Sequence, residues 1–194
     1  MAKQHRALQR QPSTDKEGRD RVHFERVTFS KFSDDIRKYC GDSIRSEDLY
    51  DMWVEIPIPK RKTQFSCGYD VATPIPITIP AHSSVIVPTG IKAVFSEDEM
   101  KTWCVKLYAR SSVGIKDKVV VTNGTGLIDS DFQFSENDGD MLLALTNMSN
   151  VLRQYKPGDR ICQAVFEIYG VTSDDDASGT RTGGLGSTHL GKTE

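Results

Sequence analysis

Two short segments carry side chains suited to phosphate chemistry, and the first follows the apolar run WCVKLY. The segment ARSSVG combines the guanidinium of Arg110, the hydroxyls of Ser111 and Ser112, and a glycine. Charge, hydroxyl donors and backbone N–H groups at a strand-to-loop transition can hold a phosphate. On these residues alone, a solvated turn beside an arginine explains the segment better.

The second segment places two carboxylates, Asp129 and Asp131, after the glycine-rich turn TNGTG. On an extended strand, residues two positions apart point to the same face. One carboxylate could therefore orient a water molecule as a general base. The alternative is the polar flank of a hairpin.

Two further segments are ambiguous when taken singly. KPGDRICQ is a Pro-Gly turn that enters a strand, with Asp159, Arg160 and Gln163 near the strand start, and a structural Asp–Arg pair accounts for it. RTGGLGST begins at Arg181 and is rich in glycine. It could fold over a phosphate, but flexible linkers have the same composition.

The elements that must position these groups are mostly strands. Between Gln64 and Tyr169 the sequence consists of short runs rich in Val, Ile, Thr and aromatics, broken by Gly and Pro, which predicts an all-β sandwich or barrel. One helical turn is expected after Ser96. We predict a disordered basic arm over 1–21, an N-terminal extension over 22–62, a β domain over 63–170 and a flexible glycine-rich arm over 171–194.

The N-terminal extension has a mixed pattern. VHFERVTF alternates like a strand, and two short helices are predicted after Ser33 and Ser46 as caps. A second strand is predicted in MWVEIPIP. The extension should therefore contain both strand and short helices.

Composition limits the classes of partner. The 194 residues suffice for one core, and 25 basic against 27 acidic residues give a net charge of -2, so no nucleic-acid partner is expected. No apolar run approaches the roughly 18 residues of a membrane helix and no secretory signal is visible, so we expect no membrane partner and a cytoplasmic location. The cysteines form no CxxC pair, which predicts reduced, mostly buried thiols at Cys40, Cys67, Cys104 and Cys162.

Taken in order, five segments resemble the five sequence motifs of the homotrimeric dUTPase family. They are SCGYDV, ARSSVG, GLIDSDF with its upstream asparagine, GDRICQ and TGGLGST. The spacing agrees with the family pattern, since 19 positions separate Arg110 from Asp129 and six separate Asn123 from Asp129. The resemblance covers about Gln64 to Thr188.

The resemblance implies a jelly-roll-like β-barrel that forms a homotrimer, with each active site built from several subunits. It implies hydrolysis of dUTP to dUMP and pyrophosphate. Asp129 would be the general base that activates the water attacking the α-phosphate. The implied metal is Mg²⁺ on the triphosphate, touched only through water, with Asp70 in its outer shell.

The same resemblance assigns the substrate contacts. Arg110, Ser111, Ser112 and Gln163 would bind phosphates, and Phe132 would lie against the deoxyribose. Asn123 and main-chain groups from Gly126, Leu127 and Ile128 to the returning strand near Met141 would hydrogen-bond uracil. Arg181 would reach the triphosphate from another subunit, and the arm would close over the nucleotide with Leu185, Gly186, Ser187 and Thr188.

The sequence departs from the family pattern in four ways. Phe132 replaces the usual tyrosine, and Leu185 replaces the phenylalanine expected to stack on uracil. The step from Arg181 to the paired glycines is one residue shorter than usual. The hairpin also carries an insertion of five residues, 134–138, beside the expected pocket.

Two alternatives follow from the resemblance. The dCTP deaminase branch shares the fold, but it usually follows Arg-Ser-Ser with a further arginine, whereas Val113 and Gly114 follow here. The other alternative is a protein of this fold with an added regulatory role. Such a role would use a protein partner bound through residues 1–60 or the insertion 134–138.

Overall fold

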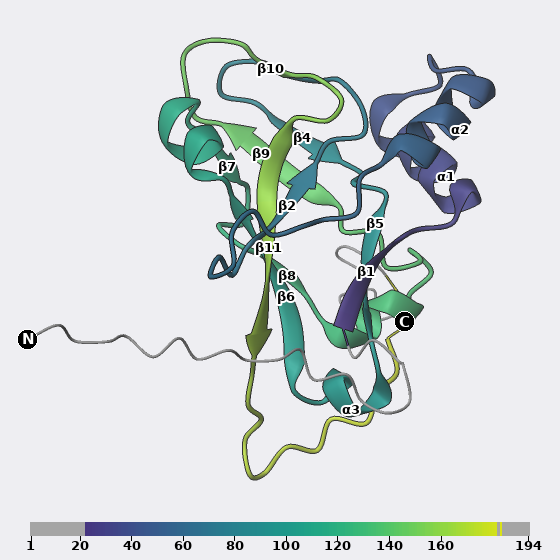
Figure 1. Ribbon diagram of the computed structural model, residues 1–194, viewed down its shortest axis with the longest axis vertical. Helices are drawn as coiled ribbons and strands as arrows, with labels where there is room; N and C mark the ends of the chain where they lie inside the picture. Colours follow the sequence, from purple (N-terminus) through teal and green to yellow (C-terminus); the bar gives the residue numbers. More distant parts are fainter. Residues whose placement is uncertain (1–21, 182, 184–194) are drawn as a thin grey trace, which may run out of the picture.

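The computed structural model describes residues 22–181 and residue 183, and Figure 1 shows its elements. The helices and helical turns are α1 (Phe29–Cys40), α2 (Ser46–Glu55), α3 (Glu97–Met100), the π-helical turn η1 (Ser112–Lys116) and the 3-10 turn η2 (Ser130–Phe134). The strands are β1 (Val22–Arg26), β2 (Tyr69–Ala72), β3 (Ile77–Ile79), β4 (Ser84–Val87), β5 (Ile91–Phe95), β6 (Trp103–Ala109), β7 (Val119–Val121), β8 (Gly126–Ile128), β9 (Leu143–Asn147), β10 (Arg153–Tyr155) and β11 (Arg160–Ile168). Among these helices, none is long and apolar enough to span a membrane.

The strands form antiparallel sheets, which confirms the predicted all-β class. The largest sheet has the order β2-β11-β6-β8, and a second has the order β4-β9-β7. Two further pairs join β1 to β5 and β3 to β10. The long strands β6 and β11 run side by side along the length of the molecule (Figure 1). Their alternation buries one face, with Val105 and Leu107 of β6 in the core, and leaves Lys106 and Tyr108 half-buried on the other.

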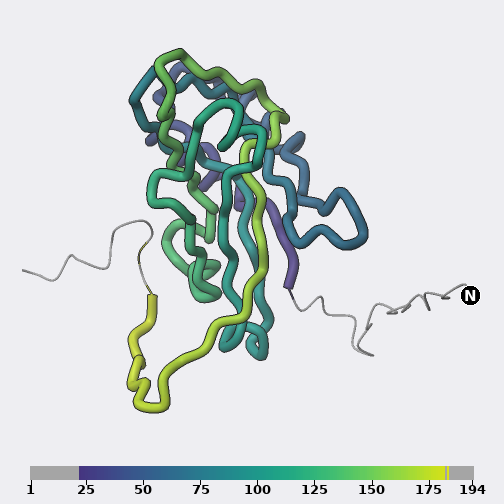
Figure 2. The backbone as a smooth tube through the Cα atoms, turned by 90° about the vertical axis from the view of Figure 1, so that its left-hand side faces the viewer, coloured from purple at the N-terminus to yellow at the C-terminus, as the bar shows by residue number. Residues whose placement is uncertain are grey.

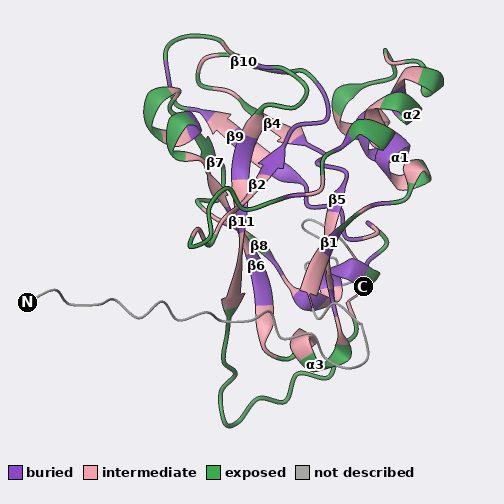
Figure 3. Ribbon diagram, viewed as in Figure 1, coloured by how far each residue is buried: buried purple, intermediate pink, exposed green. Residues whose placement is uncertain are grey.

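The core continues from the sheets into the N-terminal extension. Figure 3 shows buried segments along β6 and β11 and on α1, with exposed residues on α2 and on the outer loops. The largest fully buried side chains come from both regions: Val27, Phe32, Ile36, Leu49, Ile56, Ile79, Ile91, Leu107, Met141, Leu143, Leu145 and Ile161. The extension is therefore packed as part of the same core.

The extension starts as predicted, with a strand, but its helix boundaries differ. β1 pairs with β5 from Val22 opposite Phe95 to Arg26 opposite Ile91. Helix α1 begins after Thr28, not after Ser33, because the Thr28 hydroxyl accepts a hydrogen bond from the Lys31 N–H at 3.4 Å. Ser33 is buried inside the helix.

The strand predicted in MWVEIPIP is absent from the described chain, and α2 continues through this region to Glu55. The aromatic side chains explain the difference. Trp53 packs edge-on against Phe29, and its indole N–H donates to the Val27 carbonyl oxygen at 2.8 Å. These contacts require helical spacing from Leu49, which is buried one turn earlier.

The C-terminal segment leaves the sheet after β11 and returns along the body of the molecule (Figure 2). Tyr169 anchors its start, because its backbone N–H donates to the Thr102 carbonyl oxygen and its hydroxyl donates to that of Met100. Residues 171–180 are exposed and irregular. Arg181, which ends this segment, is half-buried.

The four thiols divide evenly. Cys104 and Cys162 are buried, as predicted, whereas Cys40 and Cys67 are exposed, so the prediction of mostly buried thiols holds for only two of them. Burial raises the pKa of the Cys162 thiol to about 12.

Candidate active site

The polar face of the β2-β11-β6-β8 sheet carries most of the side chains that the sequence singled out. Gln163 of β11 lies opposite Asp70 of β2 on one side and Tyr108 of β6 on the other, so all three side chains share a face. β8 pairs with β6 at Val105 opposite Ile128, which places Asp129 level with Cys104. Asp129 therefore follows the edge strand of the same sheet.

An arginine cluster, consisting of Asp70, Arg110 and Arg160, lies at one end of β6. Asp70 Oδ1 pairs with Arg110 Nε at 2.9 Å, and its Oδ2 pairs with Arg160 Nη1 at 2.7 Å. Arg110 Nη1 also donates to the Arg160 carbonyl oxygen at 3.2 Å. Asp70 thus fixes both guanidinium groups and leaves the cluster with one excess positive charge.

Gln163 lies directly against Gly68 of the first motif. A Cβ atom at Gly68 would stand 2.2 Å from Gln163 Oε1, closer than any real contact allows. A side chain at this position would displace Gln163, so the close approach of the glutamine, not an unusual backbone angle, favours glycine here.

Ser111 and Ser112 are exposed beside the arginine cluster. They enter the turn η1, in which the Gly114 N–H donates to the Arg110 carbonyl oxygen at 2.8 Å and the Asp117 N–H donates to that of Ser112 at 3.2 Å. The sequence predicted a strand-to-loop transition here, and the loop takes the form of a single wide helical turn.

A hairpin cluster, consisting of Asp129, Asp131, Phe132 and Arg181, lies near the other end of β6. Arg181 pairs with both carboxylates of its own chain, through Nε to Asp131 Oδ1 at 2.8 Å and through Nη2 to Asp129 Oδ2, whereas the resemblance implied contact with another subunit. The guanidinium carbon lies 5.8 Å from the centre of the buried Phe132 ring, within cation–π range. Both carboxylates face this one partner, although residues 130–134 form the turn η2 and not the extended strand predicted.

The groups predicted to bind uracil are only partly exposed. Asn123 is exposed in a turn closed by the Gly124 N–H, which donates to the Val121 carbonyl oxygen at 2.8 Å. Leu127 is also exposed, and Gly126 lies against the side chain of Leu107. Ile128 completes this short strand and is buried.

Met141 departs from the prediction. Its side chain is fully buried, and its backbone N–H donates to the Ile91 carbonyl oxygen at 3.0 Å. Since this donor is already used by Ile91 of β5, it is not free to meet a base. The sequence motif alone could not show this, because the partner lies 50 positions earlier in the chain.

The structure does not bring the two clusters together within one chain. Arg110 follows the last residue of β6, whereas Asp129 lies level with Cys104, six positions earlier on the strand. Six extended residues span about 20 Å. The arginine cluster and the hairpin cluster are therefore two half-sites.

One polar network near the half-sites escaped sequence reasoning. Glu167 accepts hydrogen bonds from Lys106 Nζ at 2.6 Å and from the Tyr108 hydroxyl at 2.8 Å, on the same sheet face as Asp129. The Lys106 ammonium holds the pKa of Glu167 below its usual value, and the Glu167 carboxylate raises that of Tyr108. Alternating polar residues at 106 and 108 were the available sequence signal.

The donor groups present fit a metal held through water, not a dedicated metal centre. Among residues 22–181 and 183, no three His, Cys, Asp or Glu side chains are grouped to ligate an ion. A carboxylate offers about four acceptor positions, of which the two arginines occupy two on Asp70. Asp70 can therefore still accept hydrogen bonds from water on an ion. The arm residues Leu185, Gly186, Ser187 and Thr188 lie outside the described residues.

The fold and these two half-sites define an all-β protein equipped for phosphate chemistry at one end of a strand and for carboxylate chemistry at the other. The family model for dUTPase matches residues 54–189. The chain belongs to the dUTPase family, and the match takes in both half-sites.

Individual relatives agree. The chain is 33% identical to deoxyuridine 5'-triphosphate nucleotidohydrolase of Lactococcus lactis over 136 residues, which cover 69% of this chain and 88% of the relative. It is 34% identical to the enzyme of that name from Pasteurella multocida over 145 residues, covering 71% and 89%. A crystal structure of dUTPase from Streptococcus mutans superimposes with a TM-score of 0.58 at 27% identity, covering 77% of this chain and 98% of that one.

Proposed function

We propose that the chain hydrolyses dUTP to dUMP and pyrophosphate at active sites shared between the subunits of a homotrimer. Membership of the dUTPase family supports the substrate and the reaction. The separation of the two half-sites by about 20 Å supports the sharing, because one chain cannot offer Arg110 and Asp129 to one triphosphate. A second subunit supplies the missing half.

Asp129 acts as the general base. It accepts a proton from the water that attacks the α-phosphorus, the bond from that phosphorus to the bridging oxygen breaks, and pyrophosphate leaves. In this structure the Arg181 guanidinium neutralises Asp129 and Asp131. A bound triphosphate carries more negative charge than the two carboxylates and competes for Arg181. Transfer of Arg181 to the phosphates frees Asp129 to accept the proton.

The arginine cluster holds the leaving phosphates. Arg110 is oriented by Asp70, which reduces the entropy lost when the guanidinium meets a phosphate. The exposed hydroxyls of Ser111 and Ser112 donate to phosphate oxygens where charge develops. Gln163, held against Gly68, donates its amide N–H groups beside them.

Residues 123–132, which include β8 and part of η2, select the base and the sugar. The side-chain amide of Asn123 and the backbone between Gly126 and Ile128 hydrogen-bond the uracil edge. Cytosine presents a donor where uracil presents an acceptor, so it leaves buried polar groups unpaired, which is the most discriminating form of rejection. The Phe132 ring lies against the deoxyribose and excludes a 2'-hydroxyl.

Mg²⁺ bound to the triphosphate supplies further neutralisation of its charge. Asp70 would hold the ion through water, because its two arginine contacts leave acceptor positions free. We place the enzyme in the cytoplasm, where free nucleotides are hydrolysed and where its four free thiols stay reduced.

A substrate panel tests the reaction. Purified protein with magnesium should release pyrophosphate from dUTP and much less from dCTP, dTTP and UTP. No pyrophosphate from dUTP, or release of ammonia from dCTP, would overturn the assignment.

Subunit complementation tests the sharing. Arg110→Ala and Asp129→Asn should each be inactive alone, and mixing them under conditions of subunit exchange should restore activity, because some sites combine an intact Arg110 with an intact Asp129. The matched control mixes Arg110→Ala with Gln163→Ala. Both changes lie in the same half-site, so this mixture should stay inactive. Equal results from the two mixtures would refute a shared site.

A further inference from the structure

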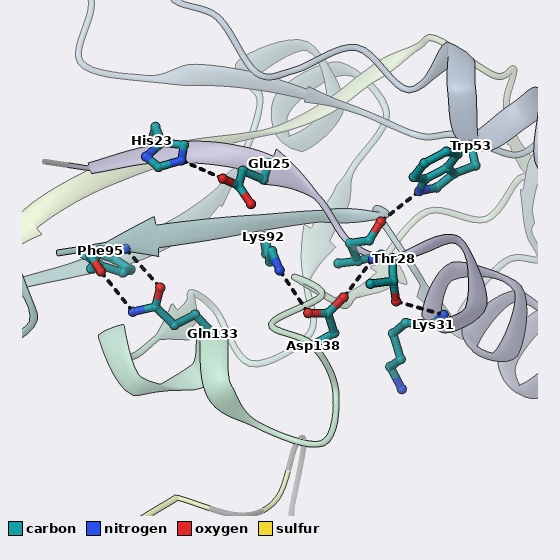
Figure 4. A network of polar contacts seen from close by, with 10 residues as sticks. His23, Glu25, Thr28, Lys31, Trp53, Lys92, Phe95, Gln133 and Asp138 are labelled. Atoms are coloured by element: carbon teal, nitrogen blue, oxygen red, sulfur yellow. Dashed lines mark hydrogen bonds and ion pairs between the residues drawn. The ribbon is translucent and has the colours of Figure 1, made fainter. Parts of the chain in front are cut away.

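The insertion in the hairpin ends in a residue that contacts the N-terminal extension. Asp138 Oδ2 accepts a hydrogen bond of 2.7 Å from the backbone N–H of Thr28, and its Oδ1 pairs with Lys92 Nζ of β5 at 2.9 Å (Figure 4). Thr28 is the residue that caps α1, so the carboxylate also lies at the positive end of this twelve-residue helix. Partial burial raises the pKa of Asp138, but the Thr28 and Lys92 contacts outweigh this effect and hold the pKa below its usual value.

A second contact joins α1 to the residue before Met141. Asp140 is fully buried, and its Oδ1 accepts hydrogen bonds from the N–H groups of Thr89 at 3.2 Å and Gly90 at 3.0 Å. Its carboxyl group faces Asp35 of α1, which is also buried and pairs through Oδ1 with Lys31 at 2.9 Å. Within the described chain, neither Oδ2 atom has a further partner. One proton shared between them satisfies both.

The other limb of the hairpin is fixed to β5 as well. Gln133 Oε1 accepts from the Phe95 N–H at 3.2 Å, and Gln133 Nε2 donates to the Phe95 carbonyl oxygen (Figure 4). Gln133 Nε2 also donates to the Ser130 carbonyl oxygen. β5 is in turn the strand that pairs with β1 of the extension. The hairpin from 130 to 141 is therefore held at both limbs by a strand that the extension completes.

We propose that the N-terminal extension is a positioning element for sugar recognition: α1 and β1 hold the segment 130–141 through Asp138 and Asp140, and so set the position of the Phe132 ring that excludes a 2'-hydroxyl. The inference rests on the function proposed above. It also gives the insertion 134–138 a partner within the chain, namely Thr28 and Lys92. Asp138 and Asp35 are positioning residues, since neither belongs to the residues assigned to the substrate.

The test compares two substitutions within the insertion. Asp138→Ala removes the contact with Thr28 of the extension and the ion pair with Lys92 of β5, and Glu136→Ala, at an exposed position of the same segment, is the matched control. Loss of the anchor should raise KM for dUTP and lower the ratio of kcat/KM for dUTP over UTP by about tenfold, with kcat for dUTP nearly unchanged. Glu136→Ala should leave all three quantities at their original values.

Two further measurements make the result decisive. Asp138→Asn keeps an acceptor for the Thr28 N–H and loses the ion pair with Lys92, so its selectivity should lie between those of the unaltered chain and Asp138→Ala. All rates are measured well below each variant's melting temperature, so that every variant is folded. A smaller amount of folded enzyme would lower both rates equally and leave the ratio between the two substrates unchanged. An unchanged ratio in Asp138→Ala would overturn the inference. A failure of the unaltered chain to hydrolyse dUTP would overturn the proposed function instead.

Discussion

Asp70 Oδ1 lies 2.9 Å from Arg110 Nε, while the other oxygen of the same carboxylate holds Arg160 at 2.7 Å. The first sequence motif therefore acts on the second by direct contact, and the fourth motif shares the carboxylate. A segment that offered a single aspartate to sequence reasoning is the link that orients the phosphate-binding guanidinium.

Replacing Asp70 by alanine should lower kcat/KM for dUTP by about 10- to 100-fold, because a charge-assisted pair contributes roughly 1.5–3 kcal/mol and Arg110 loses its fixed orientation. Steady-state kinetics measure the effect. The control is Asp48→Asn, which breaks an exposed pair with Arg45 far from both half-sites and should leave the rate unchanged. Equal rates for the two variants would remove Asp70 from this role.

Replacing Asp129 by asparagine should abolish turnover and preserve nucleotide binding, because the amide keeps the shape of the carboxylate and cannot accept the proton. Isothermal titration with a non-hydrolysable dUTP analogue, beside a pyrophosphate assay, separates the two effects. Asp131→Asn is the comparison variant, since it also weakens the contact with Arg181 but leaves the base intact. Turnover that survives in Asp129→Asn would assign the base elsewhere.

Replacing Arg181 by alanine should reduce kcat by about 10- to 1000-fold, because one group that stabilises developing charge contributes on this scale. The substitution should also raise the affinity of Asp129 and Asp131 for divalent cations, since the two carboxylates lose their common partner. Thr180→Ala, the exposed neighbour, serves as the control in both assays. A rate as high as that of the control would show that another group completes the site.

Gly68→Ala should cut activity through Gln163 alone. The added Cβ would stand 2.2 Å from Gln163 Oε1 and must displace that side chain. In a double-mutant cycle, Gly68→Ala combined with Gln163→Ala should then be no worse than Gln163→Ala by itself. Additive losses would show that Gly68 matters for another reason.

The sequence predicted what local patterns determine. The alternation of apolar and polar residues, with the turn residues between them, predicted the β class. The order of the motifs predicted the family, because both kinds of pattern are local features of the sequence. The prediction from sequence placed the start of α1 too late and assigned a strand to the end of α2. Both were wrong because Thr28 and Trp53 are fixed by hydrogen bonds that form only in the folded chain.

The same limit applies to the candidate site. The residue types at 110, 129 and 163 were visible, but the separation of the half-sites depends on strand register, which no single motif contains. Met141 fell at the expected position in sequence and has its N–H committed to Ile91. The contact of Asp138 with Thr28 spans 110 positions and has no local signature.

The buried pair of Asp140 and Asp35 predicts an unusual pH dependence of stability. Burial, and then the facing Asp35 carboxylate, raise the pKa of Asp140 well above its usual value, and the Gly90 and Thr89 donors oppose this only in part. The folded state therefore binds a proton that the unfolded state releases above about pH 4, so this group makes the free energy of unfolding fall as pH rises toward the folded pKa. Lys31 pairs with Asp35 from the same helix at 2.9 Å.

Asp140→Asn should remove this dependence. The amide oxygen can accept from Thr89 and Gly90, and the amide nitrogen can donate to Asp35 without a titrating proton. Urea unfolding from about pH 5 to about pH 8 should show the variant gaining stability relative to the unaltered chain as pH rises. Asp34→Asn, exposed on the same helix, should follow the unaltered chain throughout. A constant difference between Asp140→Asn and the unaltered chain would show that Asp140 is ionised at every pH in this range.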